Sequence, residues 1–309
     1  MGSYRRCMVA TVLFVLIPGL SAVRADEKKP QRVSFKTADG VTIVADYYAP
    51  VPQAGQKAPI AILLHMYPAD RSSWRDFAMN LSSVGFAVLA IDMRGQGESI
   101  EPADMQLADR YKKRDPTLFR SMHEDVAAAY HWLTRQPDVD RTRFALVGAS
   151  VGCSVAMDYA RQDASVDVVV CLSPGANYMG INSLAHIRKY GDRPLLLAAS
   201  EKERDAPEAL AKSVPRAVVK IYPMGGRDTF GMHGTNLLAH VPELAKLATD
   251  TIREGVGNPA ASPVVATFRG KVYYAPDNPY VQQIKSEDLR YFSSAAEAEA
   301  RGLRAASRP

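Results

Sequence analysis

Ser150 lies in the segment Gly148 to Gly152, where an apolar run that predicts a strand meets a pattern that predicts a helix. A serine at the tip of a sharp strand-to-helix turn can act as a nucleophile, because the helix N-terminus directs free N–H groups toward the reaction centre. Glycines on both sides remove side chains that would collide with a neighbouring strand or helix. Because this five-residue pattern also occurs in ordinary turns, its interpretation depends on partner residues elsewhere in the chain.

Two partners of matching chemistry follow Ser150 along the chain. One is an acidic residue in the segment 200–207, and the other is His233 in a glycine-rich run. In serine hydrolases a histidine takes the proton of the serine, and an acid holds that histidine in the correct tautomer. The order serine, acid, histidine is expected when an elbow serine is served by later loops.

The elements that position these residues are predicted from apolar runs that alternate with helical patterns. The runs lie at 59–64, 86–91, 144–149, 168–172, 194–198 and 217–222. Such alternation predicts a mainly parallel sheet with helices on both faces, and a site at the carboxyl ends of its strands. The β-rich runs 32–36 and 41–48 flank a glycine-containing turn, which predicts an antiparallel hairpin at a sheet edge.

These features together resemble the α/β-hydrolase fold, nearest to dienelactone-hydrolase-like proteins and small serine esterases. The resemblance covers about residues 33–253 and depends on His65-Met66-Tyr67, the run 92–99, the elbow and His233-Gly234. It implies that Ser150 is the nucleophile and His233 the general base. It also implies that the backbone N–H groups of Tyr67 and Val151 form the oxyanion hole. Family members often have His-Gly where this chain has His65-Met66.

The acid that serves His233 has two candidates. The segment 200–207 resembles the family pattern G-x-x-D-x-x-(V/A)-P, which places Glu203 at the acid position and leaves Asp205 as the alternative. Asp228 is near His233 in the sequence, but its glycine-rich surroundings favour a turn residue.

The substrate is expected to be a small-molecule acyl ester or lactone. Four residues are predicted to contact it, and their side chains favour an apolar acyl or aryl group: Met66, Tyr178, Met179 and Met232.

We expect no cofactor, and no histidine pair has metal-ligand spacing. His65 is expected to shape the oxyanion loop. The rival interpretation is a non-catalytic exported binding protein on the same fold.

The composition is that of a globular protein, with 309 residues of which 47% are hydrophobic and 23% charged. Three positive charges of the net +5 lie before residue 26, which leaves +2, so nothing indicates nucleic-acid binding. Arg5-Arg6 followed by the apolar run 9–20 predicts a signal peptide over residues 1–25, cleaved after Ala25. A periplasmic or secreted protein is therefore expected, with a hydrolase domain at 26–257.

Cys153 and Cys171 remain after the predicted cleavage. Both occupy apolar surroundings typical of buried free thiols, although an exported protein could also form a disulfide between them.

The segment 258–309 is predicted to be a linker followed by a small α+β module. Residues 268–309 resemble the metal-binding domain of the Ada DNA-repair methyltransferase, but the four cysteine positions hold Tyr274, Asn278, Ala306 and Pro309. Metal binding and DNA repair therefore do not carry over. A module of this size without metal or disulfide needs support from the hydrolase domain or from a protein or envelope partner.

Overall fold

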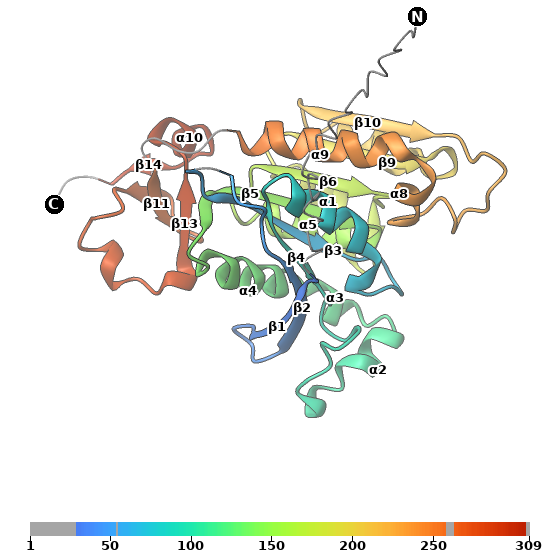
Figure 1. The fold of residues 1–309 in the computed structure, drawn as a ribbon, viewed down its shortest axis with the longest axis horizontal. Helices are drawn as coiled ribbons and strands as arrows, with labels where there is room; N and C mark the ends of the chain where they lie inside the picture. The colour runs from blue at the N-terminus through green and yellow to red at the C-terminus, as the bar shows by residue number, and fades with distance from the viewer. Residues whose placement is uncertain (1–28, 54, 258–262, 307–309) are drawn as a thin grey trace, which may run out of the picture.

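The computed structural model describes residues 29–53, 55–257 and 263–306, and an eight-stranded sheet forms its centre (Figure 1). The strand order is β1-β2-β4-β3-β5-β6-β9-β10, in which β1 pairs antiparallel with β2, β2 pairs antiparallel with β4, and the other neighbours are parallel. The strands are β1 (Gln31–Lys36), β2 (Thr42–Tyr48), β3 (Ala58–Leu64), β4 (Ala87–Ile91), β5 (Val139–Ala149), β6 (Val168–Leu172), β9 (Leu195–Ser200) and β10 (Ala217–Tyr222).

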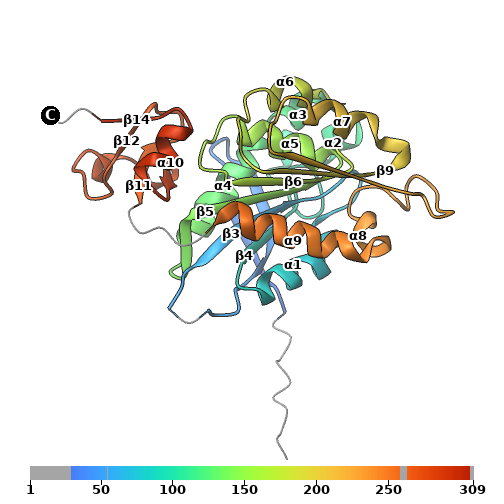
Figure 2. The same cartoon turned by 90° about the horizontal axis from the view of Figure 1, so that it is seen from above.

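Helices cover both faces of this sheet (Figure 2). One face is covered by α1 (Arg75–Ser83), α8 (Asn236–His240) and α9 (Pro242–Val256), and the other by α4 (His123–Thr134), α5 (Val151–Ala160), α6 (Ser183–Ile187) and α7 (Asp205–Ala211). Every residue of β3, β4 and β6 is buried, because helices pack on both of their faces. The predicted parallel sheet with helices on both faces is confirmed, as is the antiparallel edge hairpin.

Short elements lie beyond the carboxyl ends of the central strands. They are α2 (Leu107–Lys112), α3 (Pro116–Arg120) and the hairpin of β7 (Asn177–Tyr178) and β8 (Ile181–Asn182). The hairpin packs tightly on α3, since a Cβ added at Gly180 would lie 2.7 Å from Cβ of Pro116. Short 3₁₀ helices occur at Arg71–Trp74, Ala103–Met105, Glu201–Glu203, Val281–Gln283 and Ser286–Asp288.

The C-terminal module is a second, four-stranded sheet with one helix. Its strands are β11 (Val264–Thr267), β12 (Val272–Tyr274), β13 (Leu289–Phe292) and β14 (Arg304–Ala305), in the order β13-β11-β12-β14, with α10 (Ala295–Ala300). The small α+β module predicted from the sequence is therefore present in the structure. The predicted signal peptide and residues 258–262 of the predicted linker lie outside the described residues.

Two arginines of the module bind the loop that follows α5. The Arg290 side chain is buried, donates to Oδ2 of Asp163 at 2.5 Å and to the Tyr159 hydroxyl at 3.2 Å, and packs 4.4 Å from the centre of the Phe268 ring. Arg301 donates to the Val166 carbonyl at 2.9 Å and to the side chain of Asp167 at 2.5 Å. Buried opposite charges on the two parts of the chain therefore neutralise each other across this contact.

We expect Arg290→Ala to lower the free energy of unfolding by about 3–5 kcal/mol, because it leaves the buried Asp163 carboxylate without its cationic partner. Arg304→Ala in the same module is the control, since Arg304 is exposed and should change stability by about 0.5 kcal/mol or less. Urea unfolding monitored by circular dichroism measures both. Equal effects of the two substitutions would contradict a stabilising role for the buried pair.

Candidate active site

Ser150 occupies a strained turn between β5 and α5. Its φ of 51° and ψ of −115° place it in a conformation that residues with a side chain rarely adopt. A Cβ added at Gly148 would lie 2.4 Å from the carbonyl carbon of Gly152, and one added at Gly152 would lie 2.2 Å from the carbonyl oxygen of Leu64. The two glycines therefore let the helix approach both its own strand and the neighbouring β3.

The backbone around Ser150 leaves N–H groups free at the N-terminus of α5. The Ser150 N–H donates to the Leu172 carbonyl at 2.8 Å, which fixes the turn at Ser150 against the end of β6. Val151 is the first residue of α5, so its N–H has no acceptor within the helix. This predicted oxyanion donor thus directly follows the predicted nucleophile at a positive helix terminus.

Glu203 and His233 lie side by side. Nδ1 of His233 is 2.5 Å from Oε1 of Glu203, and both side chains are about one-fifth exposed. Burial raises the pKa of the Glu203 carboxyl, but hydrogen bonds and charge from His233 outweigh burial and lower this pKa below its usual range. Asp205, the alternative acid, begins α7 and is exposed. Of the two acids offered by the sequence, the structure brings Glu203 to the histidine.

The expected site also requires a contact between Ser150 and His233. Among the described residues, no hydrogen bond joins these two side chains. Hydrogen bonds between a nucleophile and its base often tighten only when substrate binds. The Tyr178 phenol lies close by. Burial and the charge of Glu203 raise its pKa to about 12, and an interaction with the Ser150 side chain acts in the opposite direction.

Tyr67, the other predicted oxyanion donor, follows β3. Leu64 at the end of β3 pairs with Gly148, so the loop of Tyr67 leaves the sheet beside the elbow. The structure gives the Tyr67 N–H no hydrogen-bond partner among the described residues. The Tyr67 ring packs on Tyr111 of α2 with 4.9 Å between ring centres, and the Arg114 guanidinium lies 5.1 Å from the centre of the Tyr67 ring.

His65 connects two loops below this site. Its Nδ1 contacts the Met66 carbonyl at 2.9 Å, and its Nε2 accepts the Met93 N–H at 3.1 Å. Burial lowers the pKa of His65, which favours the neutral imidazole that this pairing requires. The geometry agrees with the structural role expected for this residue.

The run 92–99, which helped to carry the family resemblance, forms ion pairs that shape neighbouring loops. Asp92 accepts the backbone N–H of Arg71 at 2.9 Å and is also paired with the Arg71 guanidinium. Nε of Arg94 donates to Oδ1 of Asp125 at 2.7 Å, and burial raises the pKa of Asp125 to about 6. These residues support the loops beside the site and take no part in the pair formed by the acid and the histidine.

The four residues predicted to contact the substrate are separated by the structure. Met66 and Met232 are only 4% and 1% exposed and belong to the core under the helices α1 and α9. Met66 packs beneath the histidine loop, since a Cβ added at Gly234 would lie 2.5 Å from its sulfur. Tyr178 and Met179 are partly exposed in the β7–β8 hairpin on the other side of the sheet. Of the four, only Tyr178 and Met179 are accessible at the surface.

Sequence reasoning missed Ser173, the residue that follows β6. Its hydroxyl accepts the Gly234 N–H at 2.9 Å and helps to lower the pKa of the Glu203 carboxyl. The only sequence signal was its position directly after an apolar strand, which it shares with the other strand-end residues of the site.

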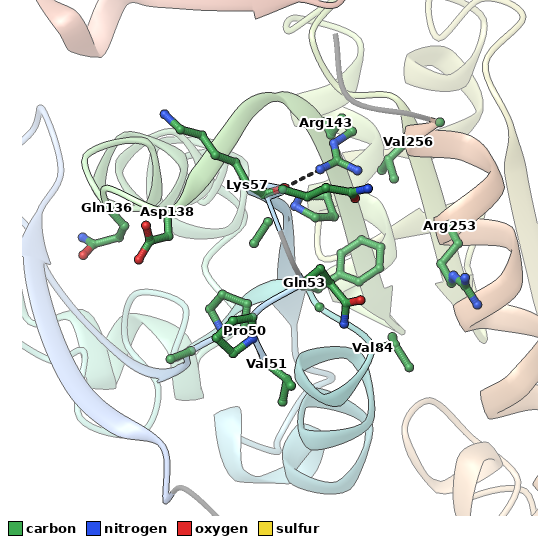
Figure 3. A pocket seen from close by; sticks show the side chains of 18 of the residues that line it. Pro50, Val51, Gln53, Lys57, Val84, Gln136, Asp138, Arg143, Arg253 and Val256 are labelled. Carbon is green, nitrogen blue, oxygen red and sulfur yellow. Dashed lines mark hydrogen bonds between the residues drawn. The ribbon is translucent and has the colours of Figure 1, made fainter.

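A cavity of about 960 Å³ lies at the opposite end of the sheet (Figure 3). It is lined near the amino ends of β3 and β5 by residues that include Val51, Lys57, Asp138 and Arg253, and Arg143 donates to the Lys57 carbonyl beside it at 2.5 Å. Because Ser150 lies past the carboxyl end of β5, this cavity is separate from the candidate active site.

Cys153 and Cys171 are buried free thiols, and the Cys153 thiol contacts the Gly148 carbonyl at 3.2 Å. Within residues 29–53, 55–257 and 263–306, no group of three or more His, Cys, Asp or Glu side chains is arranged to hold a metal ion. The helices of the described chain include none that is both long and apolar enough to cross a membrane.

Comparison with known proteins places these features in context. A sequence model of the family described as alpha/beta hydrolase fold matches residues 59–294, more than half of the chain. An uncharacterized protein of Mycobacterium tuberculosis is 30% identical over 131 residues, which cover 42% of this chain and 41% of the relative. A thiohydrolase of Arthrinium phaeospermum is 26% identical over 185 residues, which cover 57% of this chain and 52% of the relative. The matches thus span about half or less of the length of these relatives.

Solved structures share the fold at low identity. The crystal structure of dienelactone hydrolase from Anabaena variabilis superposes with a TM-score of 0.58 at 20% identity, covering 74% of this chain and 100% of that one. This likeness concerns the fold alone.

We expect Gly152→Ala to lower the free energy of unfolding by about 1–3 kcal/mol, because the added Cβ would overlap the backbone of Leu64. Gly191→Ala is the matched control. Gly191 has a positive φ of 83° but open space around it, so it should cost about 1 kcal/mol from backbone strain alone. Thermal and urea unfolding compare the two variants. A loss clearly below about 1 kcal/mol in Gly152→Ala would show that the elbow tolerates a side chain.

Proposed function

The chain belongs to the alpha/beta hydrolase fold family, and on this premise we propose that it is a serine hydrolase that cleaves an ester-like bond through an acyl-enzyme at Ser150. The observation that carries the proposal is the contact between Nδ1 of His233 and Glu203. The serine elbow follows the carboxyl end of β5. A carboxylate on Nδ1 leaves Nε2 as the nitrogen that can take a proton from a serine.

In the first half of the proposed reaction, Oγ of Ser150 attacks the carbonyl carbon of the ester while Nε2 of His233 takes the hydroxyl proton. The negative charge that develops on the carbonyl oxygen is stabilised by the N–H groups of Val151 and Tyr67. Glu203 stabilises the imidazolium without taking its proton. Collapse of the tetrahedral intermediate breaks the bond to the leaving alcohol, which receives the proton from His233.

In the second half, water replaces the alcohol. His233 takes a proton from the water as its oxygen attacks the acyl carbon, and the same two N–H groups stabilise the second tetrahedral intermediate. Its collapse breaks the bond to Oγ of Ser150, which regains a proton from His233, and the carboxylic acid leaves.

We propose a small ester or lactone with an apolar acyl or aryl group as substrate. The partly exposed Tyr178 and Met179 support an apolar contact surface. Similar proteins include a dienelactone hydrolase and a thiohydrolase, and both names agree with hydrolysis of an acyl bond.

Export and the boundaries 26–257 and 258–309 are proposals that depend on the sequence. The N-terminal pattern of Arg5-Arg6 followed by an apolar run supports cleavage after Ala25 and a periplasmic or secreted location. We also propose that the C-terminal module docks to a protein or envelope partner. It would do so with surfaces other than the one that binds Asp163 and Asp167.

A fluorophosphonate probe should modify Ser150 in the folded protein, because it reacts with serines activated by a neighbouring base. Ser150→Ala is the control and should remain unlabelled, and mass spectrometry of the peptide identifies the adduct. Folded protein that hydrolyses no ester and carries no adduct on Ser150 would favour the alternative, a non-catalytic binding protein on this fold.

Glu203→Gln should lower kcat/KM for an aryl ester by about 10⁴-fold, since the amide no longer holds the required histidine tautomer. Asp205→Asn should change it by less than about 2-fold, because Asp205 is exposed at the start of α7. Steady-state kinetics of the two variants decide between the acids. A large loss in Asp205→Asn alone would show that the assignment of Glu203 is wrong.

A further inference from the structure

Ser173 follows β6, the strand between the nucleophile strand β5 and the strand β9 that leads to the acid. It is fully buried and has a φ of 56°, a left-handed conformation that costs a residue with a side chain about 1–2 kcal/mol. Such strain persists where the surroundings fix the residue, and it is concentrated at functional sites. The contacts of Ser173 show what fixes it.

The backbone of Ser173 is fixed to the neighbouring strand. Its N–H donates to the Ala198 carbonyl of β9 at 2.7 Å, and the preceding Leu172 carbonyl accepts the Ser150 N–H at 2.8 Å. The residues Leu172 and Ser173 therefore connect the nucleophile turn to the strand that ends before Glu203.

The side chain of Ser173 makes the remaining connection. Its oxygen accepts the N–H of Gly234, the residue after His233, at 2.9 Å, so its own proton is free to be donated. The same hydroxyl helps to lower the pKa of the Glu203 carboxyl, whose Oε2 accepts the Ser200 hydroxyl at 3.2 Å. One hydroxyl thus joins the end of β6 to the backbone of the histidine loop.

We propose that Ser173 is a positioning residue whose hydroxyl group holds the His233 loop at the end of β6, and thereby holds His233 against Glu203. The proposal rests on the proposed function, because it concerns the same acid and base. A hydroxyl is donor and acceptor at once, which neither alanine nor glycine can replace. Glycine would remove the backbone strain, so the presence of serine at this φ points to the need for the hydroxyl.

Loss of the hydroxyl has two physical consequences. The buried Gly234 N–H loses its acceptor, which loosens the loop that carries His233. The Glu203 carboxylate loses the influence of the Ser173 hydroxyl that lowers its pKa, so this pKa should rise toward the usual range. The effect on catalysis should appear in kcat, because substrate contacts are unchanged.

Ser173→Ala and Ser173→Gly form a matched pair, since both remove the hydroxyl but only glycine relieves the strain. We expect kcat for an aryl ester to fall about 10-fold in both, with KM changed less than about 2-fold. Ser154→Ala is the control. Ser154 is an equally buried serine of α5 whose hydroxyl pairs with Ser183 at 2.7 Å, and its loss should leave kcat unchanged.

A carboxyl NMR titration of Glu203 in the wild type and in each variant is the second measurement, and it requires no substrate. We expect an upward shift of the Glu203 pKa in both Ser173 variants and none in Ser154→Ala. Wild-type kcat in Ser173→Gly, or an unshifted Glu203 titration in both Ser173 variants, would overturn the proposal. If the wild type neither hydrolyses esters nor reacts with the fluorophosphonate probe, the proposed function fails, and the titration still decides the role of Ser173.

Discussion

The close approach of α5 to the sheet determines the geometry of the whole candidate site. Gly152 lies so near the Leu64 carbonyl that a single added carbon would overlap it, and Gly148 meets the first turn of α5 in the same way. Only with both side chains absent can the chain turn from strand to helix within one residue. Ser150 therefore occupies the tip of the turn with a strained backbone, and the free N–H groups of α5 begin beside its hydroxyl.

The strand order then decides which loops meet at that turn. β6 pairs with β5 on one side and with β9 on the other, so its end lies between the nucleophile and the acid. The histidine loop comes from beyond β10 and reaches this point through the bond from Gly234 to Ser173. The nucleophile turn, the acid and the histidine loop thus converge on the end of one central strand. Along the chain, these three segments are 30 or more residues apart.

The sequence was sufficient for features that depend on local pattern, and insufficient for those that depend on strand order. Apolar runs and glycine spacing predicted the sheet and the elbow. The motif around Glu203 placed this residue, ahead of Asp205, at the position that contacts His233. Met66 was expected beside the substrate, yet its chain turns inward and its side chain packs beneath Gly234. Ser173 carried no motif, because its partners come from loops whose proximity only the assembled sheet creates.

The charged residues of the C-terminal module show the same dependence on assembly, and they link the module to the site. In sequence, Arg290 and Arg301 resemble ordinary surface charges, but Asp163 and Asp167 lie buried against them. The loop that carries these two acids ends α5 and leads directly into β6. Ser150 lies at the other end of α5, and Ser173 at the other end of β6. The module therefore fixes the turn between α5 and β6. The far ends of these two elements carry the nucleophile and the residue that anchors the histidine loop.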